Sequence, residues 1–383
     1  MDFTIPEEAE MIRDMMRRFV AKELRPLEMK LFSEAAAHEA GPLVLPPDVE
    51  RSLRAKAMQM GLWALTTPEE LGGMGLDALS ACLVEEELGQ TFVPLSIGDV
   101  PPALYACSEA QAEAYLAPAI EGTRRPVLAL REPGGHRPET WTTCAVARPD
   151  GGYDLHGVKR LASVSEEDFY LVFALTPGVA DDEAASVTCF LVDPDLPGVA
   201  TRPAGRGFVL HLDGCAVGAE RVLGAPGGGL RLGAEYMALD MVKLGARYLG
   251  MARRLLEMSA AYARDWESFG APLGSRPATQ RMLAEMQLDV EASALLVYRA
   301  ATQLDSASSA GADARKEAIM VRTAAAAMLQ RAIDRATMIH GGPGYLDDQP
   351  MLRMYGNLVP AETLNLATEV GYAALAADLM RAD

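Results

Sequence analysis

The spacing of the apolar residues changes twice along this chain, and this change is the strongest constraint on its fold. In the first part, apolar residues recur every three or four positions, a spacing that predicts helices with one buried face. These helical stretches are residues 6–31, 47–61 and 79–88. Beyond residues 124–126 the pattern becomes that of short strands. The helical spacing returns after Gly227-Gly228-Gly229, which we interpret as a flexible joint between domains.

The middle part has the pattern of a small β domain. Its short apolar runs are separated by turn residues such as Pro149-Asp150-Gly151-Gly152. Strands are expected at residues 144–148, 153–156, 169–175 and 187–192. We therefore predict a central small β-barrel domain at residues 126–225, which follows an N-terminal helical domain at residues 1–125.

One long apolar stripe dominates the last part of the chain. Its members alternate spacings of three and four residues over about six helical turns. They are Met241, Leu244, Tyr248, Met251, Leu255, Met258 and Tyr262. Further helices are expected at residues 279–304, 314–339 and 360–380. Long helices joined by short loops predict a four-helix bundle at residues 226–383, so the fold class is α+β.

Charge and cysteine content limit the function classes. The net charge of −18 argues against a nucleic-acid or anionic-membrane partner, because such binding needs clustered Lys and Arg. Apolar runs are too short for a membrane span, and the start of the chain lacks the pattern of a secretory signal. The five cysteines form no C-x-x-C pair, and no metal-ligand spacing is present. We expect a cytoplasmic protein without a metal site.

Short motifs in a fixed order connect the three parts. They are Gly61-Leu62-Trp63, Pro68-Glu69-Glu70-Leu71-Gly72-Gly73-Met74-Gly75-Leu76, Glu86-Glu87-Leu88-Gly89, Ala129-Leu130-Arg131-Glu132-Pro133, Gly157-Val158-Lys159 with Ser163, Phe269-Gly270-Ala271-Pro272-Leu273 and Ile339-His340-Gly341-Gly342-Pro343-Gly344. Each motif is weak alone, but the ordered set covers nearly the whole chain. In this set the chain resembles the acyl-CoA dehydrogenase family.

The resemblance implies a function as well as a fold. It implies FAD as the cofactor, an acyl-CoA thioester as the substrate and α,β-dehydrogenation as the reaction. It also implies an electron-transfer flavoprotein or a similar electron acceptor, and a tetramer built as a dimer of dimers. Acyl-chain selectivity is not contained in any motif, because it depends on the shape of a binding site.

The residue for proton removal departs from the family pattern. In the family a carboxylate removes the α-proton of the thioester while a hydride leaves to the flavin. The usual glutamate falls on Asn365, whose amide cannot accept a proton. Asp240, at the position that carries the glutamate in some members, and Glu362, one helical turn before Asn365, are candidate displaced bases. A purely structural role is preferred for both, near a helix start for Asp240 and as a cap or surface residue for Glu362.

The positions expected to contact the flavin are also altered. Leu161, Trp266 and Met338 stand where the family has a tryptophan, an arginine and a glutamine. Arg264 is a poor substitute for that arginine, because its two-residue offset from Trp266 points to another face of the helix. His340 is interpreted as a capping or packing residue. The cofactor-binding positions predicted from the resemblance are Arg131, Leu161, Ser163, Phe269, Gly341 and Gly342.

Three hypotheses follow from these departures. In the first, the chain is a subunit of a heteromeric acyl-CoA dehydrogenase whose partner chain supplies the base. In the second, it is a self-sufficient homo-oligomeric dehydrogenase with a displaced base. In the third, it is a non-catalytic acyl-thioester-binding partner that has lost FAD. The first explains why several catalytic and flavin positions are changed together.

Overall fold

The computed structural model describes residues 4–37, 45–97, 100–133, 140–161, 164, 168–179, 186–204, 207–306, 312–346, 350–351 and 368–380. The chain forms two compact units. The helical unit comprises residues 1–62, 76–97 and 238–383, and the sheet unit comprises residues 63–75 and 98–237. Of the predicted site residues, Ser163, Glu362 and Asn365 lie outside the described residues.

An eight-stranded sheet forms the centre of the sheet unit. Its strands are β1 (Arg125–Ala129), β2 (Cys144–Ala147), β3 (Tyr153–Leu161), β4 (Asp168–Leu175), β5 (Val187–Val192), β6 (Val199–Ala204), β7 (Gly207–Val217) and β8 (Val222–Leu223). The strand order is β6-β7-β3-β2-β4-β5-β8, and β1 pairs with β4 in parallel. Strand β4 is apolar along nearly all its length, because both of its faces are buried.

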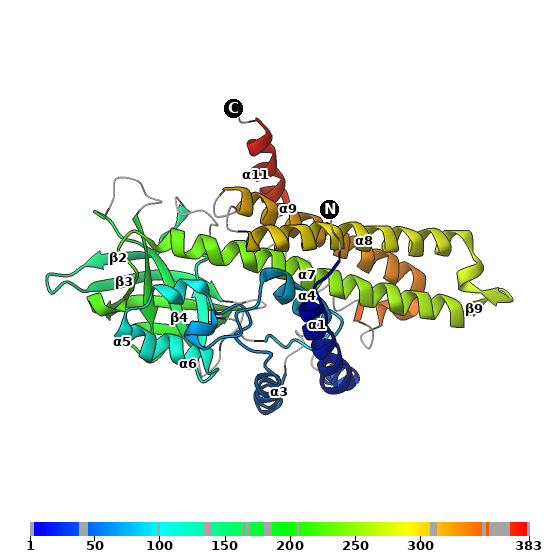
Figure 1. Ribbon diagram of the computed structural model, residues 1–383, viewed down its shortest axis with the longest axis horizontal. Coiled ribbons are helices and arrows are strands. Elements are labelled where there is room, and N and C mark those ends of the chain that lie inside the picture. Colours follow the sequence, from blue (N-terminus) through cyan, green and yellow to red (C-terminus); the bar gives the residue numbers. More distant parts are fainter. Residues whose placement is uncertain are drawn as a thin grey trace. The chain divides into compact units, whose positions relative to one another are not determined.

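Short helices cover one face of this sheet. They are η4 (Pro102–Ala106), α5 (Glu109–Gln111), η5 (Ala112–Leu116) and α6 (Ala117–Ile120), and Figure 1 shows α5 and α6 beside the strands. Tyr115 packs against Phe169 of β4, with ring centroids 5.0 Å apart. The motif that starts at Pro68 forms η3 (Glu69–Leu71) and a tight turn. A side chain at Gly73 would place its Cβ 2.2 Å from the Thr67 carbonyl oxygen, so this glycine is needed for packing.

The helical unit contains the N-terminal helices and the long C-terminal ones. The N-terminal elements are α1 (Glu7–Phe19), η1 (Val20–Leu24), η2 (Arg25–Leu27), α2 (Glu28–Ala37), α3 (Pro47–Gln59) and α4 (Ala78–Gly89). The C-terminal elements are α7 (Gly229–Asp265, of which the part from Ala238 belongs to this unit), α8 (Pro277–Asp305), α9 (Ala312–His340) and α11 (Thr368–Met380). Within the described residues, no helix is both long enough and apolar enough to cross a membrane.

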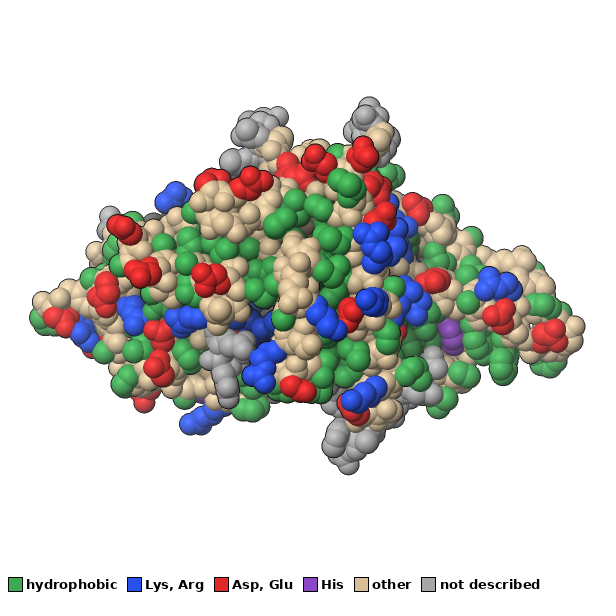
Figure 2. Space-filling view, turned by 60° about the horizontal axis from the view of Figure 1, so that its bottom comes forward, with side chains coloured by type: hydrophobic (Ala, Val, Ile, Leu, Met, Phe, Trp, Pro, Cys, Tyr) green, Lys and Arg blue, Asp and Glu red, His purple; other side chains and the backbone are tan. Residues whose placement is uncertain are grey.

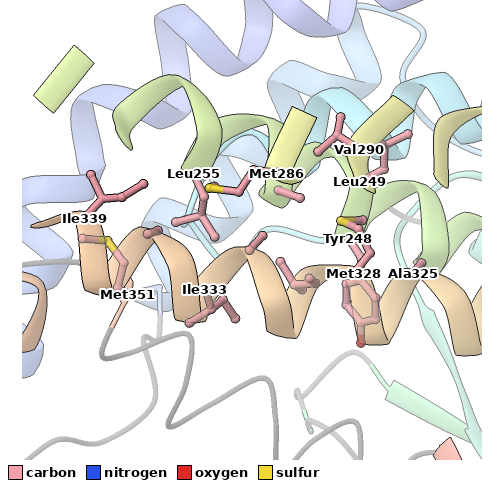
Figure 3. Close-up of a cluster of buried hydrophobic side chains, with 14 of the residues drawn as sticks. Tyr248, Leu249, Leu255, Met286, Val290, Ala325, Met328, Ile333, Ile339 and Met351 are labelled. Atoms are coloured by element: carbon pink, nitrogen blue, oxygen red, sulfur yellow. The ribbon is translucent and has the colours of Figure 1, made fainter. Parts of the chain in front are cut away.

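The predicted apolar stripe of α7 faces α8 and α9 in the core of the helical unit. Leu255 of α7, Met286 of α8 and Ile333 of α9 are fully buried there. Figure 3 shows such side chains from these helices pointing toward one another. The stripe therefore organises the bundle, as the spacing of three and four predicts.

Two glycines, Gly89 of the Glu-Glu-Leu-Gly motif and Gly250 of α7, allow α4 and α7 to touch. A side chain at Gly89 would place its Cβ 2.1 Å from the Arg247 carbonyl oxygen, and one at Gly250 would come within 1.8 Å of the Glu86 carbonyl oxygen. The Glu86 carboxylate is buried and accepts hydrogen bonds from Arg253 Nε at 2.7 Å and Tyr298 Oη at 2.5 Å. The Glu-Glu-Leu-Gly motif thus fixes helix packing in this fold.

Candidate functional site

Four aromatic side chains gather where α7 and α9 end, and we call Tyr262, Trp266, Phe269 and His340 the aromatic end. Tyr262 and Trp266 are four residues apart on consecutive turns, so their rings share a face. Their centroids are 5.5 Å apart with an interplanar angle of 11°. Tyr262 also stacks on His340, with ring centroids 4.4 Å apart and an interplanar angle of 28°. Tyr262 therefore stacks with both of these rings.

A hairpin turn places Phe269 beside this stack. Strands β9 (Glu267–Ser268) and β10 (Ala271–Pro272) pair antiparallel, which leaves Phe269 and Gly270 as the two central turn residues. Both have positive φ, 50° and 73°, as the type I′ hairpin turn requires. Glycine and asparagine tolerate such angles, whereas phenylalanine incurs about 1–3 kcal/mol of strain. The side chain of Phe269 is 100 % exposed, so local packing does not explain its presence.

The end of α9 forms the opposite wall. His340 Nδ1 lies 2.8 Å from the Ala336 carbonyl oxygen, and the ring is buried. Burial lowers the pKa of His340 and this hydrogen bond only partly offsets the effect, so the ring is neutral near pH 7. Gly341 has φ 63° and ends the helix, and its amide donates to the Thr337 carbonyl at 3.0 Å. The prediction that His340 caps carbonyls and packs is confirmed by this geometry.

These walls enclose a hollow of about 400 Å³. It is lined by Met258, Ala261, Tyr262, Asp265, Trp266, His340 and Pro343. Trp266 and Met338, which the resemblance predicts at the family's arginine and glutamine positions, are 51 % and 67 % exposed. The structure thus brings Phe269, Trp266, Met338 and the Gly341-Gly342 turn to one end of the helical unit.

The charges around the hollow do not favour a phosphate group. Asp265 is the only charged residue in its lining. Arg264 is exposed and its Nε lies 3.3 Å from the Asp265 carboxylate, while Arg276 donates to the Ser268 carbonyl oxygen at 2.7 Å. Binding of phosphate is strongest through paired donors on a cation such as arginine. The lining therefore suits a flat, uncharged ring better than a diphosphate.

The sheet unit contributes a second group of predicted flavin positions around a buried ion pair. Lys159 of β3 is 0 % exposed, and its Nζ lies 2.9 Å from Glu132 Oε1 and 3.9 Å from the centroid of the Trp141 ring. Glu132 also accepts hydrogen bonds from the amides of Thr142 at 2.7 Å and Thr143 at 3.0 Å. The pair therefore ties the segment after β1 to β3 and to the start of β2.

Burial raises the pKa of the Glu132 carboxyl, but the hydrogen bonds from Thr142 and Thr143 and the charge of Lys159 together lower it to about 2. Beside this pair, the amide of Arg160 donates to the Arg131 carbonyl oxygen at 2.8 Å. Leu161, at the end of β3, is buried in the sheet core. A flavin-binding role for Arg131 and Leu161 stays a prediction.

Of the three residues considered for proton removal, only Asp240 lies within the described part of the chain. It is exposed on α7. Burial lowers the pKa of Arg322 of α9 to about 10, and the charge of Asp240 opposes this effect. Arg322 also lies over the ring of Tyr248, 5.6 Å from its centroid. Asp240 is thus an acidic group beside a buried cation, and its role as a base stays a prediction.

Other charged groups do not form a further site. In the described part of the chain, no cluster of three or more His, Cys, Asp or Glu side chains is placed to hold a metal ion. Basic side chains on the face in Figure 2 are interspersed with acidic and hydrophobic ones.

The contribution of Tyr262 to the aromatic end was not predicted from the sequence, which assigned this residue only to the apolar stripe. Its four-residue distance from Trp266 was the signal that the two rings lie on one face of the helix.

The helical unit, the sheet unit and the ordered motifs together point to one class of protein, the acyl-CoA dehydrogenases. The family described as "Acyl-CoA dehydrogenase, N-terminal domain" matches residues 6–123, and "Acyl-CoA dehydrogenase, C-terminal domain" matches residues 227–370. The (R)-benzylsuccinyl-CoA dehydrogenase of Thauera aromatica is 31% identical over 365 residues, which cover 90% of this chain and 88% of that protein. The chain therefore belongs to the acyl-CoA dehydrogenase family.

Solved structures agree with this assignment. A chain from a study of the electron transferring flavoprotein of Acidaminococcus fermentans is 28% identical, with a TM-score of 0.85 and full coverage of both chains, 100% each. An acyl-CoA dehydrogenase complexed with FAD from Bacillus anthracis is 24% identical with a TM-score of 0.82, covering 98% of this chain and 67% of that one. The family and fold predicted from the motifs are confirmed, and family membership supports FAD as the cofactor.

Proposed function

We propose that this chain is a subunit of an acyl-CoA dehydrogenase that oxidises an acyl-CoA thioester between its α and β carbons. Another chain of the complex supplies the carboxylate that removes the α-proton. FAD, when bound, supplies the hydride acceptor. The observation that carries the proposal is the joint change of site positions on an otherwise intact family fold. Trp266 and Met338 replace polar residues at one end, and Asn365 replaces the base.

The described residues fit FAD only in part. Phe269, Gly341 and Gly342 are retained at the aromatic end, and its hollow suits a planar ring. The lining provides no cation for a diphosphate, so we assign no residue of this end to that group. A neighbouring chain with the full set of polar contacts would compensate for this loss.

Exposed apolar side chains support assembly with another chain. Leu288 and Leu295 of α8 and Tyr372, Leu379 and Met380 of α11 are exposed. Tyr372 also lines a hollow of about 460 Å³ that includes Asp289 and Arg331. Large apolar side chains that are exposed to solvent over a common patch are typical of protein–protein contacts. Assembly as a dimer of dimers, electron transfer to an electron-transfer flavoprotein and a cytoplasmic location remain predictions.

A pair of purifications tests the proposal. The chain is purified alone and after co-expression with candidate partner chains of the acyl-CoA dehydrogenase family, and flavin absorbance and oxidation of acyl-CoA thioesters are measured. We expect flavin and turnover in the co-purified complex and no turnover by this chain alone. An active, yellow homo-oligomer of this chain would contradict the role of a partner. A stable complex without flavin would instead favour the non-catalytic thioester-binding alternative.

Two substitutions separate a partner's base from a displaced one. Asn365→Glu restores a carboxylate, and we expect it to give the flavin-loaded chain measurable thioester oxidation without a partner. Asp240→Asn removes the described acidic candidate at almost constant volume. Unchanged turnover of the complex with Asp240→Asn supports the proposal. Its loss, with flavin absorbance retained, would favour Asp240 as the base.

A further inference from the structure

Two arginines lie in line across three neighbouring strands of the sheet unit. Val209 of β7 is opposite both Arg160 of β3 and Arg202 of β6 in the register of the sheet. Lys159 and Leu161, the neighbours of Arg160 along β3, are buried inside the unit. Because successive side chains point to opposite faces of a sheet, Arg160, Val209 and Arg202 share the other face, which we call the outer face. The Cα atoms of directly opposite residues are about 5 Å apart, so those of the two arginines are about 10 Å apart.

No carboxylate of these three strands lies close to the arginines on the outer face. The next row along the strands consists of Val158, His211 and Ala200. Asp213 is the first acidic residue that follows, four residues beyond Val209 on β7 and therefore about 14 Å away. In the described part of the chain, neither arginine side chain forms an ion pair. Charges more than about 8 Å apart are largely screened at physiological salt, so the surface around the arginines is locally positive although the net charge is −18.

The chemistry of the outer face matches an acidic partner protein. Both cations are arginines, which are enriched at protein interfaces, whereas lysine is depleted there. A guanidinium group can bind a carboxylate through two parallel hydrogen bonds. Val209 between the arginines and Val158 in the next row are partly buried apolar residues, so the surface is mixed rather than purely charged. Carboxylates on alternate residues of an extended segment point the same way about 7 Å apart, and such a spacing can serve both arginines.

We propose that the outer face around Arg160 and Arg202 docks a partner protein through an extended segment with acidic residues at alternate positions. The two arginines bind carboxylates of this segment, and Val209 contacts the residues between them. Asp213, at the far end of the same face, repels an acidic segment and thereby restricts it to the arginine end. This interaction goes beyond the proposed dehydrogenase function and does not involve the flavin.

A synthetic peptide with the stated pattern serves as the probe. A fluorescein-labelled decapeptide of alternating glutamate and threonine is titrated with the full chain, and its fluorescence anisotropy is compared with that of the glutamine–threonine counterpart. We expect saturable binding of the glutamate peptide alone at about 0.1 M salt. The binding should be lost at about 1 M salt, because the range of charge interactions falls from about 10 Å to about 3 Å.

Variants assign the binding to the outer face. Arg160→Gln and Arg202→Gln should each weaken binding of the glutamate peptide by about two- to fivefold, the range for one exposed ion pair. The double variant should weaken it by roughly tenfold if the two pairs contribute independently. Arg51→Gln is the matched control, since it removes an exposed arginine of α3 in the helical unit. The double reversal Arg160→Glu with Arg202→Glu should bind a lysine–threonine peptide instead.

Several results would overturn the inference. They are equal binding of the glutamate and glutamine peptides, or equal affinity of the parent chain and the double glutamine variant when their melting temperatures also agree. Displacement of the peptide by an excess of inorganic phosphate would overturn it in favour of a small oxyanion. A smaller oligomer of the double glutamine variant in sedimentation would overturn it in favour of a second copy of this chain. None of these measurements depends on flavin or turnover, so their failure would leave the proposed function intact.

Discussion

Replacement of Lys159 by methionine tests how strongly the buried ion pair holds the sheet unit together. The change leaves the Glu132 carboxylate buried, with the hydrogen bonds from Thr142 and Thr143 as its remaining support. Removal of one partner of a buried pair costs about 3–5 kcal/mol, because the other charge remains uncompensated. Loss of the contact with the Trp141 ring adds about 1 kcal/mol. We expect Lys159→Met to destabilise the sheet unit by about 4–6 kcal/mol.

The double substitution separates pairing from packing. Glu132→Gln removes the charge and keeps one of the two side-chain oxygens, so it can accept the bond from only one of the Thr142 and Thr143 amides, which donate to different oxygens of Glu132. Combined with Lys159→Met, it leaves no buried charge in the cluster. The double variant should therefore be more stable than Lys159→Met alone, with a coupling free energy of about 2 kcal/mol or more.

Urea unfolding followed by tryptophan fluorescence provides the assay. In a Trp266→Phe background, the remaining Trp63 and Trp141 both belong to the sheet unit, so its transition is followed separately. This separation matters because a chain of two units does not unfold as one two-state system by default. An unfolding free energy for Lys159→Met within about 1 kcal/mol of the parent value would refute the reasoning, provided that the slope against urea is unchanged.

Three further predictions follow from single residues. Phe269→Asn should raise the unfolding free energy of the helical unit by about 1 kcal/mol, because asparagine accepts the positive φ of the hairpin turn; unchanged or lower stability in thermal unfolding would contradict the strain. Gly250→Ala should destabilise by about 3 kcal/mol or more, since its Cβ would lie 1.8 Å from the Glu86 carbonyl oxygen, whereas Gly342→Ala, with open space around its Cβ, serves as the near-neutral control; equal melting temperatures for the two variants would contradict this difference. The lowered pKa of Glu132 should contribute about 3 kcal/mol above its ordinary pKa of 4.5, and this contribution should be lost as the pH falls toward about 2; a Glu132→Gln variant with the same acid unfolding curve would exclude it.

The fold could be recognised from the sequence because several of the characteristic residues are required by packing. Gly89 and Gly250 permit the crossing of α4 and α7, and Gly73 fits against Thr67. Such positions accept few residue types, so the motifs remain readable at low identity. The β domain was predicted from its turn chemistry and its short apolar runs, and the structure places strands over those runs. The domain predicted as a small β-barrel contains an eight-stranded sheet in the structure.

The candidate site was predicted less completely. From the sequence, Trp266 and Met338 are predicted as departures from the family pattern and Phe269 as a match to it. The sequence did not indicate that these three residues lie at the same end of the helical unit. Tyr262 was predicted as a core residue of the stripe, yet its ring also forms the centre of the stack. Lys159 and Glu132 belong to different motifs, and their ion pair depends on contacts between strands that lie apart in the sequence.

By itself, the sequence determined the order of helical and β parts and the family motifs, and it predicts that Asn365 stands where the family has its carboxylate. These features are local, because hydrophobic period and residue chemistry are set by neighbouring positions in the chain. Only the tertiary structure decided that the ends of α7 and α9 bring Trp266, Tyr262 and His340 together in stacked pairs beside Asp265. The site depends on where the ends of α7 and α9 lie, and packing along the whole length of the two helices fixes those positions.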